Sequence, residues 1–516
     1  MKTNKNRTRV ITGATTAILG MALISLVSCS SGESTNNTIA PGGSAGLSGP
    51  MVFVNNTGNS TLTSVSLKGD SGNAVVNTIP STDFEGVALG DMQLSDGDWV
   101  FTNLGAAGKV AAIDPKTAAT PFRKLNVATG TRPVHLYRDP NDGEVVWIMN
   151  DGDNRTTPTP TTTPGDDLIN CNNPLRVGGP LVGGSVTAVH NSHFGPGGVD
   201  PVALGTVCVL ADGHKVAAFS SGAGVPKRVF VSSEDAGEVA VIDDDELSPT
   251  YGDMIARIDL CQTAKEAAPC DDESLTEPTT PFTPNTSAPH GIRWSKFTKK
   301  VYSIQEGYGE ISEIDPTTYA VTPIFVLAGS PYTSFGISPN GRFLLLRGDT
   351  TPSTGTKLGV IDLGTAGNPV TNFNIPQLAG TSPGSFKFSP DSNRFYILAG
   401  NAATATKKNQ LFAFDSSTLT AAIPALTLLR EIPLVATGAH SFDVLAQTPT
   451  GAPVGTPGEA KYIVVSNSID NSLSIINAAD NQVKDTVQNV GAPGALLGGV
   501  MIFAPGTGLA GNQASS

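Results

Sequence analysis

The chain has 516 residues, a formal net charge of −13, 57 glycines and 37 prolines, and only 15% of its residues are charged. This acidity excludes proteins that bind nucleic acid through a basic face, so we expect no nucleic-acid partner. Many turn-forming residues and few charges argue against long charged helices and favour short strands joined by turns.

The first segment has the pattern of an export signal. Four basic residues among the first nine precede an apolar stretch over 10–27, and the sequence Leu-Val-Ser-Cys ends at Cys29. A basic start followed by a short apolar segment is typical of a secretory signal. The ending resembles the lipobox of bacterial lipoproteins, which implies that residues 1–29 are a signal peptide and that Cys29 is lipidated. An uncleaved membrane anchor with a chance cysteine is the alternative.

The residues after Cys29 predict a cellular location. Cys29 is followed by Ser30 rather than Asp, which resembles lipoproteins that are sent to the outer membrane. Residues 30–50 are rich in Ser, Gly, Asn and Thr and are predicted to be a flexible linker. We therefore expect a lipid-anchored protein of the bacterial cell envelope, held at the outer membrane, with a second flexible tail at 504–516.

Four cysteines follow the signal. An even number in an exported chain indicates disulfides rather than free thiols, which are the alternative. Cys261 and Cys270 flank a short loop and are predicted to pair, and Cys171 with Cys208 follows by elimination. The sequence has no CxxCH motif for covalent haem attachment.

The body of the chain repeats one strand-turn-strand unit. Its most regular strand follows a small turn and often ends in Asp. The shortest spacing between copies, from Leu67 to Asp114, is 47 residues, and a period of this size with several strands per unit indicates a β-propeller. The eight copies are 60–67, 108–114, 184–190, 237–243, 309–315, 357–362, 410–415 and 471–477.

The ends of the repeat predict how the ring closes. The chain enters the repeat at Met51 without an inner strand for its first unit, and the apolar stretch at 491–503 looks like that missing strand. We predict an all-β fold, a single propeller of eight blades over 51–503, closed by a C-terminal strand. Seven blades are the alternative, because an insertion at about 151–180 interrupts the third unit. A second insertion is expected at about 261–288.

Several units also resemble a known family. The stretches SPNGRFLLL, SPDSNRFYIL, GEVAVID and GEISEIDPTTYAV resemble the YVTN family of β-propeller repeats over about 51–503. The chain is also similar to the haem-d1 propeller of cytochrome cd1 and, more distantly, to lactonase propellers. The resemblance implies a propeller fold, and the family includes periplasmic and surface-layer proteins. The chain has no set of residues that matches the catalytic residues of the lactonases.

Four of the six histidines occupy one place in the repeat, the start of the innermost strand: His135, His214, His290 and His440. This strand lines the channel of a propeller, so the imidazoles are candidates for binding copper, zinc or iron, or for acting as axial haem ligands. The best subset is His135, His214 and His290, on three successive blades. Inherited turn residues hydrated in the channel are the alternative.

Two other groups of polar residues are weaker candidates. His190 and His193 could chelate a metal on the opposite face, although such a pair on an exposed loop usually has no role. Acidic clusters at 243–246 and 271–273, together with Asp151 and Asp153, have the oxygen ligands that calcium prefers. None has EF-hand spacing, so we interpret them as solvated turn residues.

These observations favour a binding function over catalysis. We predict a cell-envelope lipoprotein propeller that acts as a binding scaffold, with a protein or small molecule at the channel mouth and a membrane at the lipid anchor. A metal- or haem-binding redox protein that uses the channel histidines is the first alternative. A lactonase-like hydrolase is the second.

Overall fold

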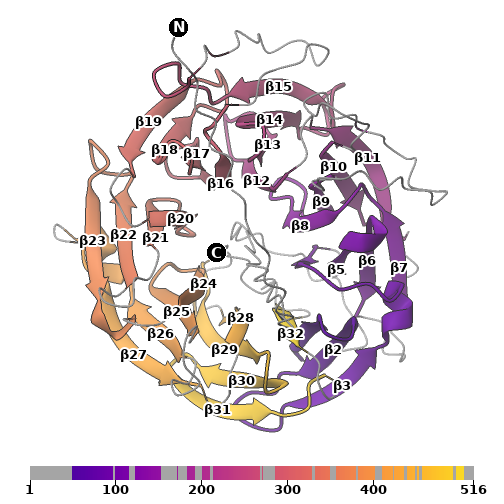
Figure 1. Ribbon diagram of the computed structural model, residues 1–516. Helices are drawn as coiled ribbons and strands as arrows, with labels where there is room; N and C mark the ends of the chain where they lie inside the picture. Colours follow the sequence, from indigo (N-terminus) through magenta and orange to yellow (C-terminus); the bar gives the residue numbers. More distant parts are fainter. Residues whose placement is uncertain are drawn as a thin grey trace, which may run out of the picture.

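The computed structural model shows a ring of eight four-stranded antiparallel sheets around a central channel (Figure 1). It describes residues 49–504 apart from these ranges: 97–98, 116–122, 153–170, 172–182, 192–199, 210–212, 268–269, 271–284, 328–331, 349–355, 379–381, 401–409, 422–423, 435–438, 448–449, 453–455 and 492–495. The predicted eight-bladed propeller is confirmed, and the seven-bladed alternative is wrong.

Each blade runs from an inner strand at the channel to an outer strand at the rim. Blade 1 is β32 (Leu497–Phe503), β1 (Met51–Asn56), β2 (Thr61–Ser66) and β3 (Ala74–Ile79). Blade 2 is β4 (Met92–Leu94), β5 (Val100–Leu104), β6 (Lys109–Asp114) and β7 (Arg123–Ala128). Blade 3 is β8 (Pro133–Arg138), β9 (Val145–Asn150), β10 (Ser185–His190) and β11 (Val202–Cys208). Blade 4 is β12 (Lys215–Ser220), β13 (Arg228–Ser233), β14 (Glu238–Asp243) and β15 (Met254–Asp259).

The remaining blades follow the same order. Blade 5 is β16 (Pro289–Ser295), β17 (Lys300–Gln305), β18 (Glu310–Ile314) and β19 (Val321–Val326). Blade 6 is β20 (Tyr332–Ile337), β21 (Phe343–Gly348), β22 (Thr356–Asp362) and β23 (Val370–Ile375). Blade 7 is β24 (Ser382–Phe388), β25 (Arg394–Gly400), β26 (Gln410–Asp415) and β27 (Thr427–Pro433). Blade 8 is β28 (Ala439–Gln447), β29 (Glu459–Asn467), β30 (Ser472–Asn477) and β31 (Gln482–Val487). Short 3₁₀ helices occur at Ser81–Phe84, Gly105–Ala107, Pro376–Leu378 and Ser417–Thr420.

The middle strands form the core because both of their faces are covered by neighbouring blades. Every residue of β1, β9 and β14 is buried, whereas the outer strand β11 exposes its first four residues. The core between blades 3, 4 and 5 includes Trp147, Phe230 and Trp294. Strands that are buried on both sides read as continuous apolar runs, which is why the repeat was visible in the sequence.

A buried asparagine ties the second strand to the third in several blades. The Asn150 Nδ2 donates to the hydroxyls of Ser185 and Thr187, at 3.1 and 3.0 Å. Asn56 in blade 1 and Asn467 in blade 8 make the equivalent pairs of bonds. Because a buried amide must find partners, this position fixes the register of each pair of strands.

The turn into the third strand needs an unusual backbone. In blade 4 this position is Gly237, with φ of 72°, and a Cβ atom there would lie 2.0 Å from Asn285 Oδ1. Asn285 in turn donates from Nδ2 to the Gly237 carbonyl at 2.9 Å. Only glycine combines this left-handed φ with so close an approach.

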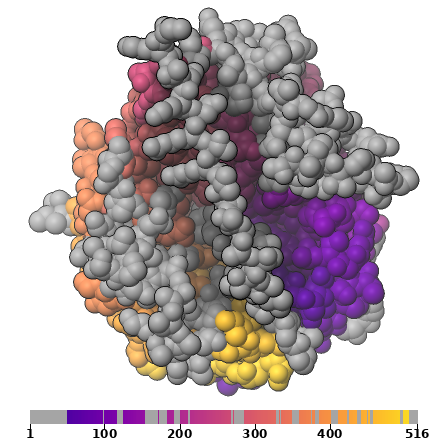
Figure 2. Space-filling view, in the orientation of Figure 1, coloured from indigo at the N-terminus to yellow at the C-terminus, as the bar shows by residue number. Residues whose placement is uncertain are grey.

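The C-terminal strand closes the ring. β32 pairs with β1 from Met51↔Phe503 to Asn56↔Leu497 and so becomes the inner strand of blade 1. In Figure 2 the indigo and yellow parts of the chain lie next to one another. Closure leaves no free sheet edge between the first and last blades, as the sequence predicted.

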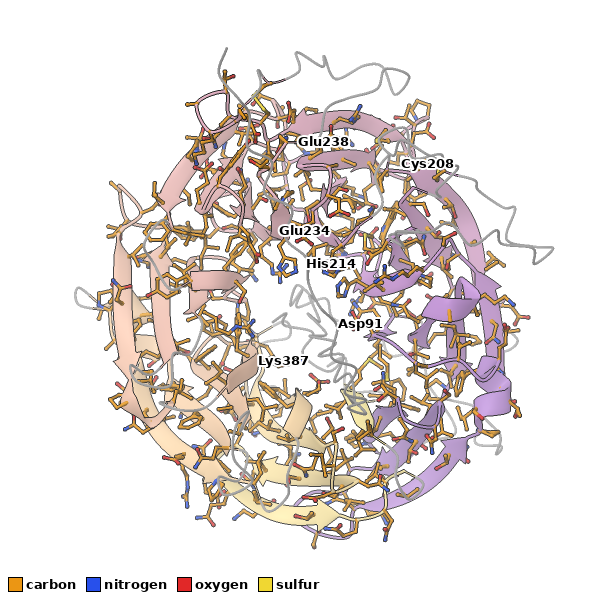
Figure 3. The ribbon with its side chains drawn as sticks, in the orientation of Figure 1. Asp91, Cys208, His214, Glu234, Glu238 and Lys387 are labelled. Carbon is orange, nitrogen blue, oxygen red and sulfur yellow. A yellow bond between two sulfur atoms is a disulfide. The ribbon has the colours of Figure 1, made fainter. Side chains whose placement is uncertain are left out.

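A buried ion pair connects the blades on both sides of the closure. Lys387 of β24 donates to Asp443 Oδ1 at 3.1 Å, and Asp443 Oδ2 accepts the backbone N–H of Ile502 at 2.8 Å. Asp443 is 2% exposed, and burial raises the pKa of its carboxyl although Lys387 offsets part of that effect. One carboxyl in blade 8 therefore holds both blade 7 and the closing strand; Figure 3 labels Lys387.

Two disulfides join the cysteine pairs predicted from the sequence, Cys171 with Cys208 and Cys261 with Cys270. Cys29, the expected linker and tail, the Thr/Pro tract and most of both insertions lie outside the described residues. Among the described residues, no helix has the length and apolar character needed to cross a membrane.

The solvated-turn interpretation of the 243–246 cluster is wrong for two of its residues. Asp243 and Asp244 are each only 2% exposed, and Asp151 is equally buried. Asp243 is paired with Arg228 and accepts the Thr250 hydroxyl at 2.6 Å. The sequence could not show this, because the covering residues come from other turns of the chain.

Deleting 491–516 should sharply lower the melting temperature, because it removes the inner strand of blade 1 and exposes the edge of β1. Thermal unfolding followed by circular dichroism measures this. Deleting 505–516 alone retains β32 and is the matched control. Equal melting temperatures for the two deletions would show that the ring does not depend on β32.

Asp443→Asn should lower the free energy of unfolding by about 3–5 kcal/mol, because it leaves the buried Lys387 ammonium without a charge partner. Urea denaturation measures the change. The control Asp480→Asn breaks the exposed ion pair with Lys484 and should leave the midpoint of urea denaturation unchanged. A loss no larger than in the control would contradict the role of the pair.

Candidate metal centre

Three of the four predicted histidines meet at one side of the channel mouth. His135 is the third residue of β8, His214 directly precedes β12, and His290 is the second residue of β16. They belong to blades 3, 4 and 5, and each blade brings the start of its inner strand to the channel. Figure 3 shows His214 near Asp91 and Glu234 on one side of the central opening.

The imidazoles of His135 and His214 point at one another. Their Nε2 atoms are 3.0 Å apart, with ring centroids at 4.7 Å and planes at 82°. The His290 ring lies 5.1 Å from that of His214, at an interplanar angle of 33°. The two Nε2 atoms of the first pair are therefore in contact, and the His290 ring lies beside that of His214.

Carboxylates lie next to the Nδ1 atoms of these rings. Asp91 Oδ2 is 2.6 Å from His135 Nδ1, and Glu306 Oε1 is 3.0 Å from His290 Nδ1. Asp151 Oδ2 lies 3.6 Å from His214 Nδ1, close enough for an ionic attraction but longer than a hydrogen bond. Each of the three imidazoles thus has a carboxylate facing its Nδ1 atom.

Burial and neighbouring charges act on the site in opposite directions. Burial lowers the pKa of His214, and the adjacent His135 and His290 add to this effect although Asp151 opposes it. The hydrogen bond to Glu306 raises the pKa of His290. Burial raises the pKa of Glu234, which also faces His290. The pKa values of His214 and His290 are therefore shifted in opposite directions.

The tautomers of the central pair follow from these contacts. The Asp91 carboxylate accepts the proton on His135 Nδ1, which leaves a lone pair on His135 Nε2. Without a metal, an N–H on His214 Nε2 donates to that lone pair. If this proton moves to His214 Nδ1, which faces Asp151, both Nε2 lone pairs become available to one cation.

Access to the channel differs among the three side chains. The side chain of His135 is 2% exposed, that of His214 is 21% exposed and that of His290 is 31% exposed. The site is thus anchored in protein on the blade 3 side and open on the blade 5 side.

The other predicted histidines lie elsewhere. His440 is in β28 of blade 8, three blades from β8 around the ring. His190 ends β10 on the opposite face, and His193 lies outside the described residues. His190 groups with Asp142 and Glu144, and this is the one set in the described ranges with three ligand atoms all within 4.8 Å of one another.

Sequence reasoning named Asp151 only as a possible calcium ligand and missed the other carboxylates of the channel site. Asp151, Glu234 and Glu306 each directly follow the second strand of blades 3, 4 and 5. Asp91 directly precedes β4, where blade 4 has His214 before β12. An acid at one fixed repeat position in the same three blades that carry a histidine at another is the signal that would have found them.

Comparisons with known proteins give the fold and no family. No family model matches the chain, and no curated protein sequence matches it significantly. Among solved structures, AztD from Citrobacter koseri matches with a TM-score of 0.52 and 10% identity, over 89% of this chain and 98% of that one. The YVTN resemblance therefore remains a prediction.

Two structures of proteins named as lactonases also match. The periplasmic gluconolactonase PpgL of Pseudomonas aeruginosa gives a TM-score of 0.48 at 15% identity, over 89% of this chain and 100% of that one. A putative 6-phosphogluconolactonase from Bacteroides fragilis gives 0.44 at 14% identity, over 90% and 100%. At these identities the likeness concerns the propeller fold alone.

Proposed function

We propose that the protein is a cell-envelope propeller that binds a divalent transition metal, with zinc favoured, at its channel mouth. The observation that carries this proposal is the 3.0 Å separation of the Nε2 atoms of His135 and His214. Binding, rather than turnover, is the function that these residues support best.

The separation suits two ligands of one tetrahedral ion. Nitrogens that each lie 2.0–2.1 Å from a tetrahedral zinc are about 3.3 Å from one another. The observed distance differs from this by a few tenths of an ångström. The ring of His290 lies beside that of His214, but among the described residues the three imidazoles do not bring one nitrogen each within 4.8 Å of one another, so the proposed protein ligands are His135 and His214.

The carboxylates supply the support that metal-binding imidazoles use. A ligating histidine usually donates its second N–H to a carboxylate, which fixes the tautomer and makes the ligating nitrogen more basic. Asp91 takes this role for His135, and Asp151 and Glu306 face the equivalent atoms of His214 and His290.

The exposure of the site favours an exchangeable metal. Structural zinc sites are closed by four protein ligands, whereas functional sites keep an open position. His214 and His290 are partly exposed to the channel, so a ligand or partner at the channel mouth has access to the ion. This agrees with the binding scaffold predicted from the sequence.

The central pair does not suit the haem alternative. Two axial ligands on opposite faces of a haem iron are about 4 Å apart and need the whole macrocycle between them. The imidazoles of His135 and His214 are closer than this and nearly perpendicular. For the hydrolase alternative, the lactonase likenesses have TM-scores below 0.5 and provide no argument.

The envelope location rests on the sequence, with support from the disulfides. Both pairs, Cys171 with Cys208 and Cys261 with Cys270, suit an oxidising compartment outside the cytoplasm. Together with the export signal they support the proposal that Cys29 carries a lipid and anchors the propeller at the membrane, with the outer membrane as the proposed address.

Zinc binding is tested with purified protein stripped by EDTA, in a His190→Ala background that removes the histidine on the opposite face. We expect one tightly bound zinc per chain by competition with a chromogenic chelator. His135→Ala and His214→Ala should each weaken binding at least 100-fold. Asp91→Ala should weaken it about 10–100-fold, as the loss of a carboxylate behind a ligand does.

His440→Ala is the matched control, because His440 occupies the same repeat position in blade 8. It should leave zinc affinity unchanged, and circular dichroism should show that every variant is folded. Absence of zinc binding, or equal binding by the folded His135→Ala and His214→Ala variants, would overturn the proposed function.

Cys29→Ala should abolish incorporation of radiolabelled palmitate and leave the protein with its signal uncleaved at this site, since the lipidated residue is missing. Labelling in cells followed by gel electrophoresis measures this. Ser30→Ala is the control and should label normally. Undiminished labelling of Cys29→Ala would contradict the lipid anchor.

A further inference from the structure

A second cluster of polar side chains lies at the other end of the same strands. β8 starts near His135 and ends at Arg138, so the loop 139–144 that follows it lies on the opposite face of blade 3. His190 at the end of β10 and the 244–246 turn after β14 of blade 4 meet this loop. We call this group the rim cluster; its members are Asp139, Asp142, Glu144, His190, Asp244 and Glu246.

Three potential ligand atoms of the rim cluster surround one small space. His190 Nε2 is 3.8 Å from Asp142 Oδ2 and 3.6 Å from Glu144 Oε2. These distances are too long for hydrogen bonds. Ligand atoms that share one cation at bond lengths of 2.1–2.4 Å are about 3.0–3.7 Å apart, so the spacing is close to that of a coordination shell.

Two carboxyls next to this space are buried against each other. Asp139 is 1% exposed and Asp244 is 2% exposed, and their side chains are in contact. Asp139 accepts the Trp147 indole N–H at 3.0 Å, and Asp244 Oδ2 accepts Asn141 Nδ2 at 2.7 Å. Apart from this contact with Asp139, the second oxygen, Asp244 Oδ1, is buried without a hydrogen-bond partner.

Two further observations point to a missing positive partner. The side chain of Asn191 is fully buried with neither its oxygen nor its nitrogen hydrogen-bonded, and its backbone N–H donates to the Glu144 carbonyl at 3.1 Å. Burial raises the pKa of Tyr251, and the carboxyls of Asp244, Asp139, Asp142 and Glu246 add to this effect. Four acids therefore face one region, and Lys227, whose charge lowers the pKa of Asp244 and Glu246, offsets only part of their mutual repulsion.

We propose that the rim cluster binds a divalent cation through carboxylate oxygens and the His190 imidazole, and that this ion fastens blade 3 to blade 4. Oxygen-rich sites suit calcium and manganese, and the single imidazole favours manganese of the two. None of these residues takes part in the channel site, so this inference is independent of the proposed function.

The test uses the folded double variant His135→Ala/His214→Ala, stripped with EDTA, so that the channel site cannot contribute. Mn²⁺ binding is followed by electron paramagnetic resonance, and Ca²⁺ is used as a competitor. We expect one Mn²⁺ per chain and a melting temperature that rises with Mn²⁺ concentration. Asp142→Asn and His190→Ala should each weaken Mn²⁺ binding at least tenfold, whereas Asp480→Asn, an exposed acid on blade 8, should not.

Asp244→Asn separates a cation from a proton as the partner of the buried carboxyl pair. If a cation is the partner, the substitution should raise the melting temperature in EDTA and reduce the further rise caused by Mn²⁺. Identical melting temperatures of the double variant in EDTA and in saturating Mn²⁺ or Ca²⁺ would overturn the proposal. Unchanged Mn²⁺ affinity in the Asp142→Asn and His190→Ala variants would also overturn the proposal. If either variant fails to fold, Glu144→Gln is used in its place.

Discussion

The pairing of β32 with β1 is the constraint on which the rest of the molecule depends. Eight similar sheets form a ring only if the last segment of chain returns to the first, and here it supplies the inner strand of blade 1. Asp443 reinforces this junction from blade 8 through Lys387 on one side and Ile502 on the other. Both partners of this charge pair are buried, so removing either one would leave an uncompensated charge in the interior.

Closure of the ring brings residues at the same position of successive repeats close together at the channel. Because every blade brings the start of its inner strand to the channel, residues about 75 positions apart become neighbours when their blades are adjacent. His135, His214 and His290 meet in this way. The same geometry brings Asp151 and Glu306, which directly follow the second strands of their blades, to the Nδ1 side of the His214 and His290 rings, and it places Glu234 near His290.

The two ends of blade 3 offer different chemistry. At the channel mouth, nitrogen ligands with carboxylates behind them suit a borderline-soft ion such as zinc. At the far end, oxygen atoms dominate and two acids are nearly inaccessible to water, which suits a harder ion. The strands of one blade thus separate two candidate sites that differ in ligand type, burial and position.

The sequence by itself determined the strand repeat, the number of blades, the closing strand and the repeat position of the channel histidines. It could do so because strands buried on both faces are continuous apolar runs with fixed turns between them. Tertiary structure alone decided that Asp91 supports His135 and that Asp244 is buried against Asp139, since each pair joins different blades. The sequence of an acidic run such as 243–246 does not show whether water or another loop covers its side chains. Only tertiary packing buries Asp243 and Asp244.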